Sequence, residues 1–212
     1  MDTDRLIQAL TADNDTRSKP VGWMLAAALA LAVPISTAMF MMKLGVRADL
    51  SAAMHNPFFE LKFVFVGALL IAAVAIVLRL ARPGAPLERA RWLLTIPLGV
   101  LGIGIVTDLM IPQQSTWSAR LMGSNMKVCM TAIPVLSAPI LVASLIALRH
   151  GAATRPALAG AFAGLVSASI AATLYAAHCF DDSPLFVATW YSLAIGLVTA
   201  VGALIGARVL KF

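Results

Sequence analysis

Six nearly uncharged apolar segments, each long enough to cross a bilayer as a helix, constrain this chain more than any other feature. They run over Val21–Met42, Phe58–Leu80, Trp92–Ile111, Cys129–Leu148, Ala157–Ala177 and Phe186–Ala207. About 20 apolar residues span the hydrocarbon core, where only helices and closed barrels satisfy their backbone groups. The alternation over about ten residues that marks a β-barrel strand is not visible. The sequence therefore predicts an all-α, polytopic integral membrane protein with six transmembrane helices in one bundle.

The composition agrees with membrane insertion and argues against other classes. Hydrophobic residues make up 60% of the chain and charged residues 12%, whereas soluble domains average about half and a quarter. The net charge of +6 comes from basic residues at the ends of apolar segments. They form no stripe with interleaved aromatic residues, so nucleic-acid binding is not expected. The first twenty residues are too polar and acidic for a secretory signal peptide, so the first segment should remain as a span.

The chain is predicted to comprise a cytoplasmic N-terminal tail, residues 1–20, and one six-helix transmembrane domain, residues 21–212. Short links rich in turn-forming residues leave no room for a second domain. Six spans put both termini on one side, and Lys and Arg in short loops favour the cytoplasm. With the termini inside, eleven of the sixteen basic residues are cytoplasmic. The five on the outer side are Lys43, Arg47, Lys62, Arg120 and Lys127.

Small residues and prolines give two further expectations about packing. Gly160 with Gly164 in the fifth segment, and Gly202 with Gly206 in the sixth, have the spacing that lets membrane helices approach closely. The alternative is that glycine is simply common in this composition. Two prolines in the fourth segment each remove a helical hydrogen bond, so a kink is expected there.

Both cysteines are expected at the outer ends of adjacent segments. Cys129 begins the fourth segment and Cys179 follows the fifth; because successive spans are antiparallel, the two thiols share one depth. On the periplasmic side of a bacterial inner membrane, two thiols can form a disulfide or bind a soft metal ion, with His178 as a further candidate ligand. The alternative is that both are small buried hydrophobic residues that never meet. The sequence leaves the two interpretations evenly balanced.

Other chemistry has little support in the sequence. It contains no phosphate-binding glycine loop, no Cys-x-x-Cys and no His-Glu-x-x-His motif, so an enzyme is not expected. Asp108, at the end of the third segment, is the acidic residue best placed to bind a proton or cation. It also lies close enough to the interface to be solvated or to pair with Lys43, Lys62 or Lys127.

The tail carries a pattern typical of a short amphipathic helix. Leu6, Ile7 and Leu10 recur at helical spacing, and Thr3 or Asp4 can cap a helix over residues 4–12. An isolated helix of this length is marginal in water and folds best in a groove on a partner. The alternative, a helix on the membrane surface, is disfavoured because the acidic residues, including Asp13, repel anionic lipid.

Several short stretches of the chain look like family motifs. They are DRLIQALTAD at 4–13, GSNMKVC at 123–129, IPVLSAP at 133–139, ALRHGAATRP at 147–156, YAAHC at 175–179 and WY at 190–191. Together they resemble the NrsF family of bacterial membrane proteins, negative regulators of an extracytoplasmic-function (ECF) sigma factor of the sigma-F type. The resemblance extends over essentially the whole chain.

The resemblance implies an anti-sigma factor of the bacterial inner membrane. Such a protein holds the sigma factor away from RNA polymerase until heavy-metal or oxidative stress is sensed by paired cysteines, here Cys129 and Cys179. The expected partners are the sigma factor, on the cytoplasmic side, and membrane lipid; no cofactor, nucleic acid or enzyme substrate is expected. The tail residues expected to contact the sigma factor are Asp4, Leu6, Ile7, Leu10 and Asp13.

Two alternatives come from other functional classes. A small transporter or channel would use Asp108 and the proline-containing fourth segment, and Asp108→Asn would abolish its flux. A membrane redox protein linked to thiols or quinone would keep its turnover after deletion of residues 2–19. An anti-sigma factor would instead release its sigma factor when that tail is removed.

Overall fold

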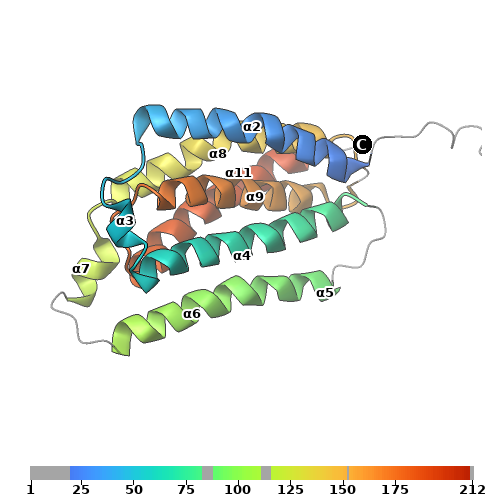
Figure 1. The fold of residues 1–212 in the computed structure, drawn as a ribbon. Coiled ribbons are helices and arrows are strands. Elements are labelled where there is room, and N and C mark those ends of the chain that lie inside the picture. Colours follow the sequence, from blue (N-terminus) through green and yellow to red (C-terminus); the bar gives the residue numbers. More distant parts are fainter. Residues whose placement is uncertain (1–19, 83–87, 111–115, 152, 211–212) are drawn as a thin grey trace, which may run out of the picture.

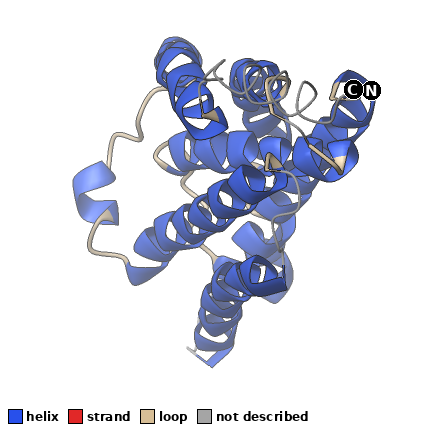
Figure 2. Cartoon of the chain, turned by 90° about the vertical axis from the view of Figure 1, so that its right-hand side faces the viewer, coloured by secondary structure: helices blue, strands red, loops and turns tan. Residues whose placement is uncertain are grey.

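The structure is a computed structural model that describes residues 20–82, 88–110, 116–151 and 153–210. Its regular secondary structure in these ranges is entirely helical (Figure 2). Six helices are long and apolar enough to cross a membrane, which confirms the predicted fold class. The six spans are α2 (Val21–Lys43), α4 (Pro57–Leu80), η1 with α6 (Trp92–Leu94 and Thr95–Met110), α7 with α8 (Trp117–Met122 and Met126–Leu148), α9 (Pro156–Ala176), and α10, η2 and α11 (Pro184–Phe186, Val187–Tyr191 and Ser192–Val209).

Local sequence explains where these helices begin. The side chain of Asn56 accepts a hydrogen bond from the backbone N–H of Phe58, at 3.0 Å, and Pro57 occupies the first turn of α4. Pro156 starts α9 in the same way, because proline lacks the N–H that a first turn leaves unpaired. α4 has 24 residues, or about 36 Å at 1.5 Å per residue, enough for a hydrocarbon core of about 30 Å. The short helices α3 (Leu50–Ala53) and α5 (Glu88–Arg91) lie in the links.

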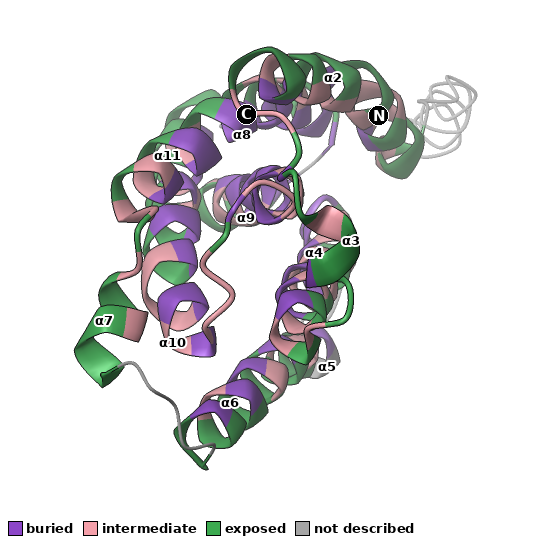
Figure 3. Ribbon diagram, turned by 60° about the vertical axis from the view of Figure 1, so that its left-hand side comes forward, coloured by how far each residue is buried: buried purple, intermediate pink, exposed green. Residues whose placement is uncertain are grey.

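Of the six spans, α9 lies at the centre of the bundle (Figure 3). α9 packs against α4, α8 and α11, and most of its residues are buried. α2 packs on α8, while α6 lies at the edge against α4 (Figure 1). The outer helices carry large exposed apolar side chains such as Leu31 and Leu98. These side chains form the surface that a bilayer would cover.

The closest helix contact joins α9 to α11 through glycines. A methyl group on Gly160 would overlap the carbonyl oxygen of Gly202, and one on Gly206 would lie 2.5 Å from the Cα of Gly160. A methyl group on Gly164 would lie 2.7 Å from the carbonyl oxygen of Val198. This contact confirms the expectation that the two glycine pairs let helices approach closely.

We therefore expect Gly160→Ala to destabilise the protein, by about 1 to 3 kcal/mol as for other overpacked cores. The added methyl group must push α11 away from α9, since the atoms it meets belong to the backbone. Gly196→Ala is the matched control, because a Cβ there meets nothing within 4 Å. Thermal unfolding of the purified protein in detergent measures the difference, and equal melting temperatures for the two variants would contradict the packing.

The two ends of the bundle differ in what they contain. At one end, which we call the terminal end, a Cβ on Gly151 would lie 3.1 Å from Val21, the first residue of α2, and 3.2 Å from the carbonyl of Ala81, just after α4. α11 also finishes there, because Gly206 lies against Pro156 at the start of α9. The opposite end, the far end, holds α3, α7 and the link between α9 and α10 (Figures 1 and 3).

α8 continues as one helix through Pro134 and Pro139, so a kink at these prolines stays a prediction. The N-terminal tail, including the expected helix over residues 4–12, lies outside the described residues.

Candidate functional site

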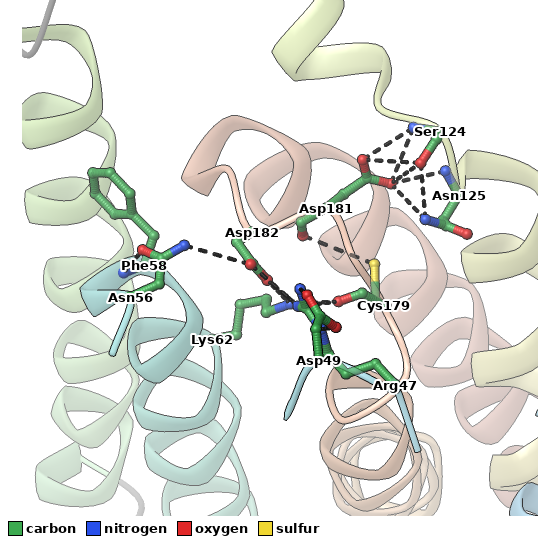
Figure 4. A network of polar contacts seen from close by, with 10 residues as sticks. All are labelled: Arg47, Asp49, Asn56, Phe58, Lys62, Ser124, Asn125, Cys179, Asp181 and Asp182. Carbon is green, nitrogen blue, oxygen red and sulfur yellow. Dashed lines mark hydrogen bonds and ion pairs between the residues drawn. The ribbon is translucent and has the colours of Figure 1, made fainter. Parts of the chain in front are cut away.

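The far end is organised around the α9–α10 loop, residues 177–183, which carries His178, Cys179, Asp181 and Asp182. Figure 4 shows the last three of these residues and their polar contacts. Cys179 is fully buried, although it stands in a loop. Its two acidic neighbours reach opposite sides of the bundle. The loop therefore connects helices that are distant in sequence.

On one side, Asp182 is held by two cations. Lys62 of α4 donates from Nζ to the Asp182 carboxylate at 2.6 Å, and Nη1 of Arg47, from the α2–α3 link, donates at 3.1 Å. Asn56 adds a longer hydrogen bond of 3.4 Å. The Lys62 side chain has no exposed surface, so its charge depends on these partners.

Arg47 extends the same network. It donates twice to Asp49, at 2.7 and 2.8 Å, and its guanidinium lies 4.7 Å from the ring centre of Phe180. The hydrogen bond from Arg47 lowers the pKa of Asp49, so this carboxylate stays charged at neutral pH. The backbone N–H of Arg47 donates to the carbonyl of Ala177. Two cations and two carboxylates thus balance in charge, which the burial of Lys62 requires.

On the other side, Asp181 binds the start of α8. Its carboxylate accepts hydrogen bonds from the backbone N–H groups of Ser124 and Asn125, at 3.0 and 2.8 Å, and from both of their side chains. An anion is stabilised at a helix N-terminus by the unpaired N–H groups and the helix dipole. Gly123 has φ of +56°, and a Cβ on it would lie 2.8 Å from the Asp181 carboxylate and 2.5 Å from Phe186. Glycine is therefore required at this turn.

Cys179 lies between the ion pairs of Asp182 on one side and the hydrogen bonds of Asp181 to the start of α8 on the other. Its carbonyl oxygen accepts hydrogen bonds from Lys62 Nζ at 3.0 Å and Arg47 Nη1 at 3.2 Å. Its Sγ lies 3.8 Å from the carbonyl of Asp181. Burial raises the pKa of the Cys179 thiol, which therefore stays protonated at neutral pH. A movement of this residue would disturb both cations at once.

Cys129 lies at the same end of the bundle, in the first turn of α8, and it is also fully buried. Its backbone N–H donates to the carbonyl of Asn125, the residue that Asp181 holds. Tyr175 links the two sides, because its hydroxyl donates to that same carbonyl at 3.3 Å. Both thiols are free, and no disulfide joins them.

Two buried tyrosines complete the surroundings of Cys179. The rings of Tyr175 and Tyr191 have no exposed surface and lie 5.6 Å apart between centres. Tyr191 ends η2, a π-helical turn, and a π-turn inside a span often marks a functional site. In the same turn, Trp190 donates from its indole to the carbonyl of Leu121 at 2.9 Å. This turn therefore contacts both the cysteine region and α7.

A second buried ion pair lies apart from this network. Asp108 of α6 and Arg120 of α7 approach to 2.7 Å, and both side chains are largely buried. The expectation that Asp108 is solvated or pairs with a lysine is therefore wrong, because it is buried against an arginine and Lys62 pairs with Asp182 instead. The pair attaches the peripheral α6 to the far end.

Comparison with known proteins identifies the family. A family model described as "NrsF: Negative regulator of sigma F" matches residues 10–212. This chain belongs to the NrsF family. It is 33% identical over 214 residues to "Anti-sigma-F factor NrsF" of Caulobacter vibrioides, and 34% identical over 222 residues to "Probable anti-sigma-F factor NrsF" of Azospira oryzae. Both comparisons cover 100% of each chain, and no solved structure matches.

Membership of the NrsF family confirms the resemblance seen in the sequence motifs. The family is described as a regulator, which agrees with the expectation that the chain is not an enzyme. The match includes every residue of the α9–α10 loop network. It begins at Leu10, so part of the tail lies before it.

The predicted site residues of this NrsF-family chain fall into two groups. Cys129, Cys179 and His178 lie together at the far end, but Nδ1 of His178 is 3.0 Å from the carbonyl of Gly45. Within the described residues, no group of three or more His, Cys, Asp and Glu is placed to hold a metal ion. The second group, the partner-binding residues Asp4, Leu6, Ile7, Leu10 and Asp13, lies outside the described residues.

Sequence reasoning missed the charged network that holds the α9–α10 loop. The sequence predicts Lys62 only as one of the basic residues of the outer side, yet it is fully buried. The available signal was that a lysine at the fifth position of an apolar segment needs a partner. Nothing in the sequence pointed to Asp182, 120 residues away, as that partner.

Proposed function

We propose that this chain holds a sigma factor of the sigma-F type at a bacterial inner membrane and releases it when the cysteine pair reacts with a heavy metal or an oxidant. The observation that carries the first part is similarity over 100% of the chain to two anti-sigma-F factors. A sigma factor bound at the membrane cannot join RNA polymerase, so binding alone represses its genes.

The proposed orientation places the terminal end in the cytoplasm. This orientation assigns eleven of the sixteen basic residues to the cytoplasmic side, in the tail, the links and the helix ends, as the positive-inside rule favours. The tail then meets the sigma factor through Leu6, Ile7 and Leu10, flanked by Asp4 and Asp13. The α9–α10 loop then faces the periplasm, where metals and oxidants arrive before they reach the cytoplasm.

The cysteine pair is the proposed sensor. Thiolates prefer soft metal ions, and two thiols with no third ligand in the described residues suit an ion that accepts two sulfur ligands. An oxidant would instead take two electrons while two protons leave and an S–S bond forms between Cys129 and Cys179. Either reaction links the start of α8 to the α9–α10 loop.

Signalling would follow from the position of Cys179. Its carbonyl holds Lys62 of α4 and Arg47 of the α2–α3 link, so drawing its sulfur toward Cys129 disturbs both attachments. A switch of this kind requires two bundle arrangements that bind the sigma factor with different affinity. α2 connects the far end to the tail directly, and we propose that it carries the change.

The pH dependence of metal binding tests this sensor. Because the Cys179 thiol is protonated at neutral pH, a metal ion must displace its proton. Cadmium binding should therefore tighten as pH rises, by about tenfold per pH unit for each proton displaced. Titrations at pH 6.5 and 7.5, followed by the absorption of the metal–thiolate bond, measure the change; pH-independent binding, or equal binding by Cys129→Ser/Cys179→Ser, would contradict the assignment.

Co-purification tests the anti-sigma function itself. The full chain and a variant lacking residues 2–19 are each expressed with the sigma factor, and the membrane fraction is isolated. We expect the full chain to retain the sigma factor and the truncated chain to lose it, with raised transcription from sigma-F promoters. Equal retention by both would show that the tail is not the binding element, and no retention by either would refute the proposed function.

A further inference from the structure

A second feature of the far end is an apolar groove between α2 and α8, with a volume of about 210 Å³. None of its lining residues belongs to the α9–α10 loop network. The groove is lined by Met39, Lys43, Leu44, Val128, Thr131, Ala132, Val135 and Leu136. Seven of these eight residues are uncharged, and the groove lies between two helices that are long enough to span a bilayer.

Two lysines lie where this groove reaches the far end of the bundle. Lys43 is the last residue of α2 and forms part of the lining. Lys127 lies in the first turn of α8, one helical turn before Thr131, so it stands on the same helix face as the lining. Both lysines are exposed.

The charges of these lysines are available to a ligand. The other three basic residues of the far end, Arg47, Lys62 and Arg120, are paired with aspartates. Within the described ranges, the ion pairs include neither Lys43 nor Lys127. The nearby carboxylate of Asp181 is already bound by the backbone and side chains of Ser124 and Asn125. The positive end of the α8 dipole adds to the attraction for an anion.

We propose that this groove binds an anionic phospholipid, with an acyl chain against the apolar lining and the phosphate held by Lys43 and Lys127. A basic head above an apolar groove between spanning helices fits such a lipid. A free phosphate ion would leave the apolar lining unfilled, and a second helix would leave the two lysines unpaired. The lipid would contact both α2 and α8 and so tie together two helices of the far end. The inference does not rest on the proposed anti-sigma function.

Native mass spectrometry of the full chain in detergent tests this site, with dioleoyl phosphatidylglycerol and dioleoyl phosphatidylcholine as probes. We expect the anionic lipid to bind the wild-type chain more tightly. Loss of two lysines near the membrane surface should weaken that binding by about 30-fold, so Lys43→Ala/Lys127→Ala should lose the preference. Lys43→Arg/Lys127→Arg is the matched control and should keep it, because both charges remain.

A third variant locates the acyl chain. Thr131→Trp fills the groove from an exposed position, so the fold should be retained while both lipids bind less. Equal affinity of the wild-type chain for the two lipids would overturn the proposal, as would an unchanged preference in the alanine variant. Displacement of the anionic lipid by millimolar inorganic phosphate, or a lipid-free dimer that Thr131→Trp abolishes, would assign the groove to another occupant and also overturn it.

Discussion

Replacing Lys62 by methionine is expected to lower the free energy of unfolding by about 3 to 5 kcal/mol, the range seen when one partner of a buried ion pair is removed. Methionine fills much the same volume, so the loss comes from the charge. Lys62 has no exposed surface and holds both the Asp182 carboxylate and the Cys179 carbonyl. Without it, the carboxylate keeps only Arg47 and Asn56 on this side.

Unfolding in detergent, without added phospholipid, measures this effect. Lys43→Met is the matched control, because Lys43 ends α2 at the same end of the bundle but is exposed. Its free energy of unfolding should stay within about 0.5 kcal/mol of wild type. The double variant Lys62→Met/Asp182→Asn should recover part of the loss, since it removes both charges of the pair. A Lys62→Met variant as stable as Lys43→Met would show that the charge pair does not hold the α9–α10 loop.

Serine in place of either cysteine is expected to abolish the transcriptional response to cadmium while leaving repression in unstressed cells intact. The site offers no more than two sulfur ligands, because the described residues contain no group of three or more candidate ligands, so the loss of one leaves a single ligand. The sigma factor binds at the other end of the protein in this scheme, so the resting complex should persist. We expect the loss of induction to be complete for Cys129→Ser and for Cys179→Ser.

The variant His178→Ala tests whether His178 is a metal ligand or only lies beside the two cysteines. Nδ1 of His178 already contacts the carbonyl of Gly45, so this variant should keep most of the cadmium response. A reporter driven by a sigma-F promoter measures induction in all three variants. The amount of each variant protein in the membrane fraction is the control for folding. Normal induction in either cysteine variant would contradict the role of the pair.

Much of the fold could be predicted because it depends on each segment alone. Hydropathy marks the six spans, and an even number of spans places the start of α2 and the end of α11 at one end of the bundle. Antiparallel neighbours also place Cys129 and Cys179 at the same end, as the structure has them. Gly160 and Gly206 could be recognised because close helix packing requires a fixed spacing of small residues.

The charged network could not be predicted, because it depends on which helices lie side by side. Asp182 pairs with Lys62 and Arg47, 120 and 135 residues away in the sequence. The depth of a charged residue in the membrane limits which residues can form an ion pair with it, but it does not identify the one that does. For the same reason, the sequence offered three lysines for Asp108, whereas the structure gives Arg120.

The release of the sigma factor by the cysteine pair is tested most directly in reconstituted vesicles. The full chain carrying bound sigma factor is treated with cadmium, and the sigma factor left on the vesicles is quantified for wild type and for Cys129→Ser/Cys179→Ser. We expect cadmium to free the sigma factor from the wild-type chain and to leave it bound to the double variant. Release from both proteins, or retention by both, would contradict a switch operated by these two thiols.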